Sequence, residues 1–91
     1  MSSNFSIAET DSFKKKLSNK DFSHLKTKLY NYVYPLLKNN PFYGGNIKKL
    51  KGEFSDIYRY RIGNFRIFYT IKEAELIVIL VDIQKRKDAY K

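Results

Sequence analysis

The chain has 91 residues, of which 43% are hydrophobic and 16% aromatic, and this composition indicates one small globular domain rather than a disordered segment. It has no cysteine, which excludes disulfide bridges and cysteine-based zinc sites, and its longest apolar run, "LIVILV" at 76–81, is far too short to cross a bilayer. Eighteen lysines and arginines against nine acidic residues give a formal net charge of +9, which indicates nucleic acid, an anionic membrane surface or an acidic protein as partner.

The first residues, "MSSNFSIAET", lack the basic-then-apolar layout of a signal peptide. The absence of cysteine suits a reducing compartment. We therefore expect a soluble, cytoplasmic protein that does not enter a membrane and that forms a single domain over residues 1–91.

The N-terminal half predicts one strand and two helices. The segment "NFSIAE" alternates apolar and polar side chains as a short strand does. Thr10 or Asp11 can cap a helix that places Phe13 and Leu17 on one face. A second helix has its apolar residues in one stripe, namely Leu25, Leu29, Val33 and Leu37. Pro35 near its end predicts either a kink in the last turns or an early stop.

The C-terminal half predicts a loop followed by three strands. "NNPFYGGN" at 39–46 is rich in Asn, Gly and Pro, which is typical of a loop. Beyond it, three segments rich in Ile, Val, Tyr and Phe are separated by turn-forming or charged residues: 56–62, 65–71 and 75–83. The order β-α-α-β-β-β predicts an α+β fold in which an antiparallel sheet packs on the two N-terminal helices.

Gly63-Asn64 predicts a tight hairpin, because glycine adopts a positive φ without strain. A two-residue loop fixes the register, so the predicted pairs are Ile62–Phe65, Arg61–Arg66, Tyr60–Ile67 and Arg59–Phe68. Side chains alternate between faces. One face is then apolar and can pack on the helices, with Tyr58, Tyr60, Ile62, Phe65, Ile67, Tyr69 and Ile71. Three arginines emerge on the other face: Arg59, Arg61 and Arg66.

The arginine face predicts a phosphate site. All four arginines lie in the last third of the chain, and arginine suits forked recognition of phosphate. Like charges opposite one another on neighbouring strands repel by a few tenths to about 1 kcal/mol, which a fold selected for stability alone would avoid. The pattern predicts no acid on this face and places Phe68 and Ile57 beside the arginines. A solvated face with snorkelling arginines is the alternative.

The end of the chain, "QKRKDAYK" at 84–91, adds basic side chains and an aromatic ring. If the strand at 75–83 lies beside 65–71, its end can bring Arg86 and Tyr90 near the hairpin arginines. Proteins that bind single-stranded RNA typically contact its phosphates with basic side chains and stack a base on an aromatic side chain. The alternative is a frayed basic terminus.

The stretch "LKGEFSDIYRYRIGNFRIFYTI", followed by "IVILVDIQKRKDAY", resembles the RelE/ParE toxin superfamily of bacterial toxin–antitoxin systems. The shared pattern is a leucine-lysine-glycine approach, a strand with basic residues at alternate positions, a G-x-[FY]-R turn and a basic C-terminus with a tyrosine. The resemblance covers residues 47–90, and the helical half agrees with it in element order. In this superfamily the RelE branch cleaves messenger RNA in the ribosomal A site, whereas the ParE branch poisons DNA gyrase.

The resemblance implies five catalytic candidates. Arg59 and Arg61 fall where RelE-type toxins carry two strand lysines, and Arg66 falls on their turn arginine. Arg86 falls on the arginine after the last strand, and Tyr90 lies near their C-terminal tyrosine. The lysines that we expect to contact RNA around them are Lys49, Lys51, Lys85 and Lys87.

The chemistry implied by the resemblance needs no metal and no small-molecule cofactor. The 2′-hydroxyl of the RNA attacks the adjacent phosphorus, leaving a 2′,3′-cyclic phosphate and a 5′-hydroxyl, while arginines stabilise the charge on the phosphate oxygens. Arg59 and Arg61 depart from the family's lysines, and with a pKa above about 12 they are poor general bases. Tyr90 or the ribosome would then handle the proton, or the activity is weakened or lost. The single histidine, His24, is expected to be structural or solvated.

The implied partners are messenger RNA on the ribosome and a cognate antitoxin protein with an acidic or amphipathic segment. Two other functions remain open. A ParE-type toxin that inhibits DNA gyrase by binding would need no cleavage, and arginine at positions 59 and 61 is compatible with it. A small RNA-binding module unrelated to toxins would expose aromatic rings on the arginine face, where the predicted register offers only Phe68.

Overall fold

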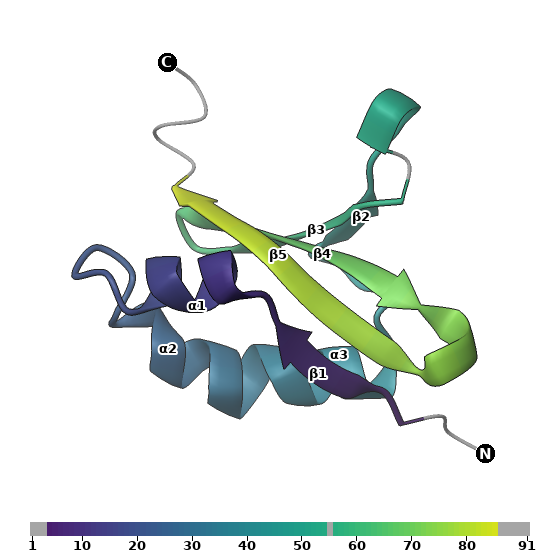
Figure 1. Cartoon of the computed structure of the whole chain (residues 1–91), viewed down its shortest axis with the longest axis horizontal. Helices are drawn as coiled ribbons and strands as arrows, with labels where there is room; N and C mark the ends of the chain where they lie inside the picture. Colours follow the sequence, from purple (N-terminus) through teal and green to yellow (C-terminus); the bar gives the residue numbers. More distant parts are fainter. Residues whose placement is uncertain (1–3, 55, 86–91) are drawn as a thin grey trace.

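The computed structural model describes residues 4–54 and 56–85, in which a helical half precedes a meander of strands (Figure 1). The helical elements are α1 (Asp11–Leu17), α2 (Leu25–Lys28), the π-helical turn η1 (Leu29–Val33), α3 (Tyr34–Asn39) and the 3-10 turns η2 (Gly52–Phe54) and η3 (Glu73–Glu75). The strands are β1 (Ser6–Glu9), β2 (Ile47–Lys49), β3 (Tyr58–Ile62), β4 (Phe65–Lys72) and β5 (Ile77–Lys85). The predicted α+β fold, with helices first and a meander after them, is confirmed.

The strands form one sheet in the order β1-β5-β4-β3-β2, and it differs from the prediction in two respects. β3 to β5 form an antiparallel meander, as predicted, and β2 pairs antiparallel with β3. β1, however, pairs parallel with β5, from Ser6 opposite Ile77 to Glu9 opposite Leu80. The sheet is therefore mixed, because β1 pairs with the last strand of the meander and not with a neighbour along the chain. The sequence also does not predict β2, since a three-residue strand with two lysines is too short to show an alternation.

Thr10, one of the two predicted caps, begins α1. Its Oγ1 accepts a hydrogen bond of 3.2 Å from the backbone N–H of Phe13, which satisfies one of the free donors of the first turn. Phe13 and Leu17 are buried, and α1 packs beside β5. The cap thus sets where the chain leaves β1 and turns back along the sheet.

The second helical stretch is continuous through α2, η1 and α3. Its predicted stripe is buried, with Leu25, Leu29, Val33 and Leu37 each at most 2% exposed. In an α-helix a four-residue step overshoots a full turn by about 40°, so this stripe would drift around the helix. The π-helical turn advances less per residue and returns the stripe to the sheet. Pro35 follows in the first turn of α3, where the chain stays helical instead of stopping.

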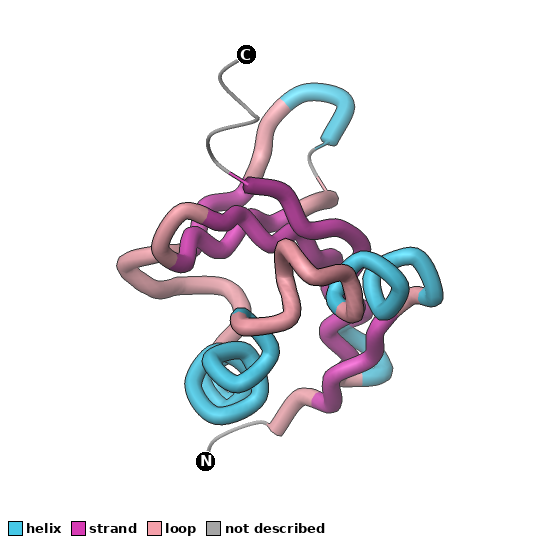
Figure 2. Tube along the Cα trace, turned by 90° about the vertical axis from the view of Figure 1, so that its left-hand side faces the viewer, coloured by secondary structure: helices cyan, strands magenta, loops and turns pink. Residues whose placement is uncertain are grey.

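Helices and sheet form two layers, so that one face of the sheet is covered and the other is open (Figure 2). The predicted apolar face of the hairpin is confirmed as the covered one. Tyr60, Ile62, Ile67 and Tyr69 are buried in the core, and Tyr58, Phe65 and Ile71 pack against it. The segment between β2 and β3, which contains η2, rises on the opposite side (Figures 1 and 2). We call the side away from the helices the open face.

Two tyrosine hydroxyls link the covered face to its surroundings. Tyr69 donates a hydrogen bond of 2.7 Å to the carbonyl of Pro41, and burial raises the pKa of the Tyr69 hydroxyl above its ordinary value. Tyr34 on α3 donates a bond of 2.6 Å to Oε2 of Glu9 on β1, and burial followed by this carboxylate raises the pKa of Tyr34. Both hydroxyls therefore stay protonated in the folded protein and donate these hydrogen bonds. Among the described helices, none is long and apolar enough to cross a membrane.

Candidate functional site

The hairpin at Gly63-Asn64 has the predicted register. Gly63 has a φ of +57° and Asn64 does not share a positive φ, which corresponds to a type II′ turn. The paired residues are Ile62–Phe65, Arg61–Arg66, Tyr60–Ile67 and Arg59–Phe68. The prediction that the arginines leave the core side is thereby confirmed, and they lie on the open face.

Arg59, Arg61 and Arg66 are each half-buried, so their charges are only partly exposed to water. Arg61 lies directly opposite Arg66. The Nε of Arg61 is buried and finds no hydrogen-bond partner among the residues that the structure describes. A buried donor without a partner costs about 1–3 kcal/mol, and the facing charges add a few tenths to about 1 kcal/mol. An anion held between the two side chains would offset both terms.

The open face also carries an acid, so the prediction that none lies there is wrong. Phe68 pairs with Asp82, whereas its neighbour Tyr69 pairs with Leu80, so Val81 is an extra residue in a β-bulge. Without the bulge Asp82 would lie opposite Ile67 on the covered face. The run "LIVILV" before Asp82 is continuously apolar, so it shows no alternation from which a bulge could be predicted.

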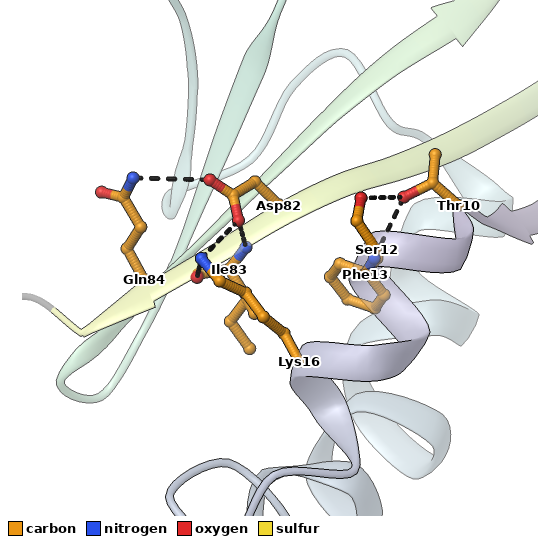
Figure 3. A network of polar contacts seen from close by, with 7 residues as sticks. All are labelled: Thr10, Ser12, Phe13, Lys16, Asp82, Ile83 and Gln84. Atoms are coloured by element: carbon orange, nitrogen blue, oxygen red, sulfur yellow. Dashed lines mark hydrogen bonds and ion pairs between the residues drawn. The ribbon is translucent and has the colours of Figure 1, made fainter.

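Asp82 is held by a small network of polar contacts (Figure 3). Its Oδ1 accepts hydrogen bonds of 2.8 Å from Nζ of Lys16 and of 2.8 Å from the backbone N–H of Ile83. Its Oδ2 receives only a long contact of 3.4 Å from Nε2 of Gln84. Burial alone raises the pKa of the Asp82 carboxyl, but these hydrogen bonds outweigh it and hold the pKa below its ordinary value. Asp82 is therefore an ionised acceptor at neutral pH.

The same network protects the edge of β5. β1 pairs with β5 only as far as Leu80, and β5 continues beyond it to Lys85. Past that point α1 lies beside the strand, and Nζ of Lys16 donates a hydrogen bond of 3.0 Å to the carbonyl of Ile83. A free strand edge would otherwise expose unpaired backbone groups. Lys16 is thus a structural residue.

The structure separates the lysines that the sequence groups together. Lys49 pairs with Tyr58, whose ring lies 5.8 Å from its Nζ, and Lys85 pairs with Phe65 and contacts Asp21 at 3.9 Å. Both pairings place these lysines on the covered side, away from the arginines. Lys51 is exposed in the segment that precedes η2.

Lys48 is the basic residue that sequence reasoning missed. It pairs with Arg59, so it extends the arginine face onto β2. The alternation of side chains along β2 would have placed Lys48 beside Arg59, but this alternation becomes visible only once the strand and its register are known. We call the basic residues that the structure describes on this side of β2, β3 and β4 the arginine face: Lys48, Arg59, Arg61 and Arg66.

Three predicted site residues, Arg86, Lys87 and Tyr90, lie outside the described residues. His24 is exposed, and its ring contacts that of Phe65 at 5.6 Å between centroids, as expected of a structural or solvated histidine. Within residues 4–54 and 56–85, no three His, Asp or Glu side chains gather in a way that could hold a metal ion. The described residues thus gather positive charge on one face of a hairpin, and such an arrangement can bind an anion.

Comparison with known proteins shows which family has a similar sequence. The family model of the ParE toxin of type II toxin–antitoxin systems, parDE, matches residues 10–90. A protein of Methanocaldococcus jannaschii named "Putative toxin RelE1" is 36% identical over 74 residues, which cover 79% of this chain and 81% of that protein.

Two solved structures share the fold. The toxin–antitoxin complex RelBE2 of Mycobacterium tuberculosis matches with a TM-score of 0.73 and 16% identity, over 92% of this chain and 93% of that chain. The archaeal RelE–RelB complex of Pyrococcus horikoshii matches with a TM-score of 0.72 and 20% identity, over 91% and 96%. At these identities the two structures support the fold alone.

Proposed function

Because this chain belongs to the ParE toxin family, and so to the RelE/ParE superfamily of type II toxin–antitoxin toxins, we propose that it is a toxin that cleaves messenger RNA on the ribosome. The observation that carries the proposal is the pairing of Arg61 with Arg66 on the open face, where Nε of Arg61 is buried and has no partner among the described residues. A phosphate of the RNA backbone has the charge and the acceptor oxygens that could satisfy the Nε of Arg61.

In the proposed reaction the 2′-hydroxyl oxygen attacks the adjacent phosphorus and the bond to the 5′-oxygen breaks. The products are a 2′,3′-cyclic phosphate and a 5′-hydroxyl. Arg59, Arg61 and Arg66 would stabilise the charge that builds on the phosphate oxygens. In other enzymes, the removal of one such hydrogen-bond donor lowers the rate by roughly 10²–10³. The resemblance adds Arg86 and Tyr90 to this set.

The proton of the 2′-hydroxyl needs another acceptor. An arginine side chain keeps its proton near neutral pH, since its pKa lies above about 12. Lys48 pairs with Arg59 and is exposed, and the proposal gives it no part in proton transfer. The proposal therefore assigns proton transfer to Tyr90 or to a group of the ribosome, and it assigns binding and charge stabilisation to the arginines.

The test is primer extension on a messenger RNA in a reconstituted translation reaction, with and without ribosomes. Wild type is expected to make cuts in register with codons that require ribosomes. Arg61→Met and Arg66→Met should lose these cuts, whereas Lys26→Met, which removes one charge from the exposed side of α2, should keep them. Cuts that survive both arginine variants would contradict the proposed role of the arginines.

A ParE-type toxin that inhibits gyrase by binding is the second candidate, because the matching family model is that of the ParE toxin. It predicts growth arrest without cuts in messenger RNA. The discriminating assay is supercoiling by purified gyrase with the toxin added. Inhibition by wild type, together with intact messenger RNA, would replace the cleavage proposal with this one.

We further propose an antitoxin partner of acidic character. The relatives RelBE2 and RelE–RelB are toxin–antitoxin complexes, and this chain has a formal net charge of +9. A partner that binds only the folded toxin raises its stability by mass action. The melting temperature of the toxin should therefore rise when the cognate antitoxin is added. Equal melting temperatures with and without the antitoxin would contradict this partner.

A further inference from the structure

The open face is hollowed beside the arginines. The hollow has a volume of about 390 Å³, at the small end of the range for ligand pockets. Its lining is mostly apolar and consists of Leu50, Ile57, Phe68, Val81, Asp82 and Gln84. Neither the phosphate chemistry above nor the packing of the core uses these side chains.

Two departures from a regular sheet create the hollow. The first is the β-bulge at Val81, which places Asp82 opposite Phe68. The second is the segment between β2 and β3, whose neck is closed by a hydrogen bond of 2.9 Å from the N–H of Leu50 to the carbonyl of Ile57. Leu50 and Ile57 thereby line the hollow together with residues of β4 and β5.

The arginine face adjoins the hollow directly. Arg59 lies opposite Phe68, and Arg66 lies opposite Gln84. Residues that face one another in an antiparallel pair have Cβ atoms about 4.5–5.5 Å apart, within the span from a nucleotide's phosphate to its base. Arg59 on β3, Phe68 on β4 and Asp82 on β5 therefore lie side by side across three neighbouring strands.

The rim of the hollow offers an acceptor that is not fully used. Oδ1 of Asp82 is occupied by Lys16 and by the N–H of Ile83. Oδ2 has only the 3.4 Å contact with Gln84, so it can accept another hydrogen bond. A carboxylate is acceptor-only and takes hydrogen bonds from amino groups such as N4 of cytosine. Its depressed pKa makes Asp82 a poor proton acceptor, which argues for recognition and against general-base catalysis.

We propose that this hollow binds one unpaired base of the RNA substrate, stacked on Phe68 and read by Asp82, and that it favours bases with an exocyclic amino group over uracil. The proposal rests on the proposed function, since it needs RNA phosphates on the arginine face. An apolar side chain of a protein partner would fill the floor but would leave Oδ2 of Asp82 without a matching donor. Phe68 and Asp82 would then set sequence preference, whereas the arginines set cleavage.

The test measures binding with the reaction blocked. The probes are ribosome complexes whose A-site codon carries 2′-O-methyl riboses, which remove the nucleophile and keep the phosphates. Three codons are compared: three cytosines, three uracils, and three abasic positions. The dissociation constant of fluorescently labelled toxin is measured for each, in wild type and variants.

Wild type should bind the cytosine codon on the order of tenfold more tightly than the uracil codon, as expected for one hydrogen bond to a charged acceptor. It should bind the abasic codon least tightly. Phe68→Ala should reduce affinity for both base-bearing codons by about tenfold, as for loss of one stacked base, and Phe68→Tyr should restore it. Asp82→Asn should bring the cytosine and uracil codons to similar affinity.

Ile79→Ala is the matched control, because Ile79 points to the open face by alternation but does not line the hollow. It should leave all three affinities unchanged. Equal binding of the cytosine, uracil and abasic codons by wild type would overturn the base site while leaving the cleavage proposal standing. Absence of binding to every complex, together with absence of cuts in unmodified messenger RNA, would overturn both. Phe68→Ala that weakens only the antitoxin complex would assign the hollow to a protein partner and overturn the base site.

Discussion

The two faces of the sheet differ in what holds them together. On the covered face, side chains such as Ile67 and Leu80 are fully buried and pack on the helices. On the open face, Arg61 faces Arg66, and Phe68 lies at the floor of an open hollow. Facing like charges lower the stability of a sheet, and other residues at these positions would stabilise the fold more. The covered face thus supplies the stability of the domain, and the difference supports the proposal that the open face binds the substrate.

The largest effect is expected on the covered face. Leu80→Ala removes a fully buried side chain from β5 and should lower the free energy of unfolding by about 2–5 kcal/mol, measured by urea denaturation. Such a loss is a large part of the stability of a small domain. Ile79→Ala, on the neighbouring residue that points to the open face, should cost about 1 kcal/mol or less. Equal losses in the two variants would break the distinction between the faces.

A polar contact on the covered face gives the next effect. Tyr69→Phe leaves the carbonyl of Pro41 without its donor, which should lower the free energy of unfolding by about 1–3 kcal/mol. Tyr32→Phe, on a helix residue that is 62% exposed, is the control and should change stability little. If both variants unfold at the wild-type urea concentration, the buried hydroxyl does not support the core.

The hairpin turn serves both faces, because it sets the register for core and arginines together. Gly63→Ala places a Cβ at a φ of +57°, which should cost about 1–2 kcal/mol. Gly45→Ala is a matched control, since its φ is not in that region and a Cβ there meets nothing within 4 Å. A thermal melt that ranks Gly45→Ala as the more damaging change would contradict the turn assignment.

The smallest effect is expected at the acid of the open face. The pKa of Asp82 is lowered in the folded protein, so the carboxylate stabilises the fold above its unfolded pKa of about 3.9, and this contribution is lost as the pH falls through the folded pKa. Because the Asp82 side chain is 40% exposed, the contribution is at most about 1 kcal/mol. Wild type should therefore lead Asp82→Asn in stability at pH 7 and lose that lead below about pH 4.

Asp21→Asn is the control for this titration. Asp21 contacts Lys85 at 3.9 Å and is 66% exposed, so Asp21→Asn should change stability at pH 7 little. A lead of wild type over Asp82→Asn that persists unchanged in acid would mean that the network around Lys16 does not depend on the charge of Asp82.

The sequence predicts the hairpin better than the sheet that surrounds it. Gly63 permits a two-residue turn, and such a turn leaves one register, so the position of every arginine on the hairpin followed from local chemistry. The stripe of the second helix was equally accessible, because leucines and valine at a fixed spacing identify a buried face.

The remaining features depend on contacts between distant segments. The parallel pairing of β1 with β5 joins the two halves of the chain, and no local pattern records it. The bulge at Val81 moves Asp82 out of the core, although the continuous apolar run before it gives no sign of a bulge. Lys48 rather than Lys49 faces the arginines because β2 pairs with β3 in one register only. The hollow depends on two of these features, the bulge and the pairing of β2 with β3.

The most direct test of the division between the faces measures Arg61→Met twice, in the same preparation. The account predicts that its free energy of unfolding equals or exceeds that of wild type, since the buried Nε without a partner among the described residues and one of two facing charges are both gone. It predicts that ribosome-dependent cleavage falls by roughly 10²–10³. An Arg61→Met protein that cleaves as wild type does, or that loses activity only because it unfolds, would contradict the account.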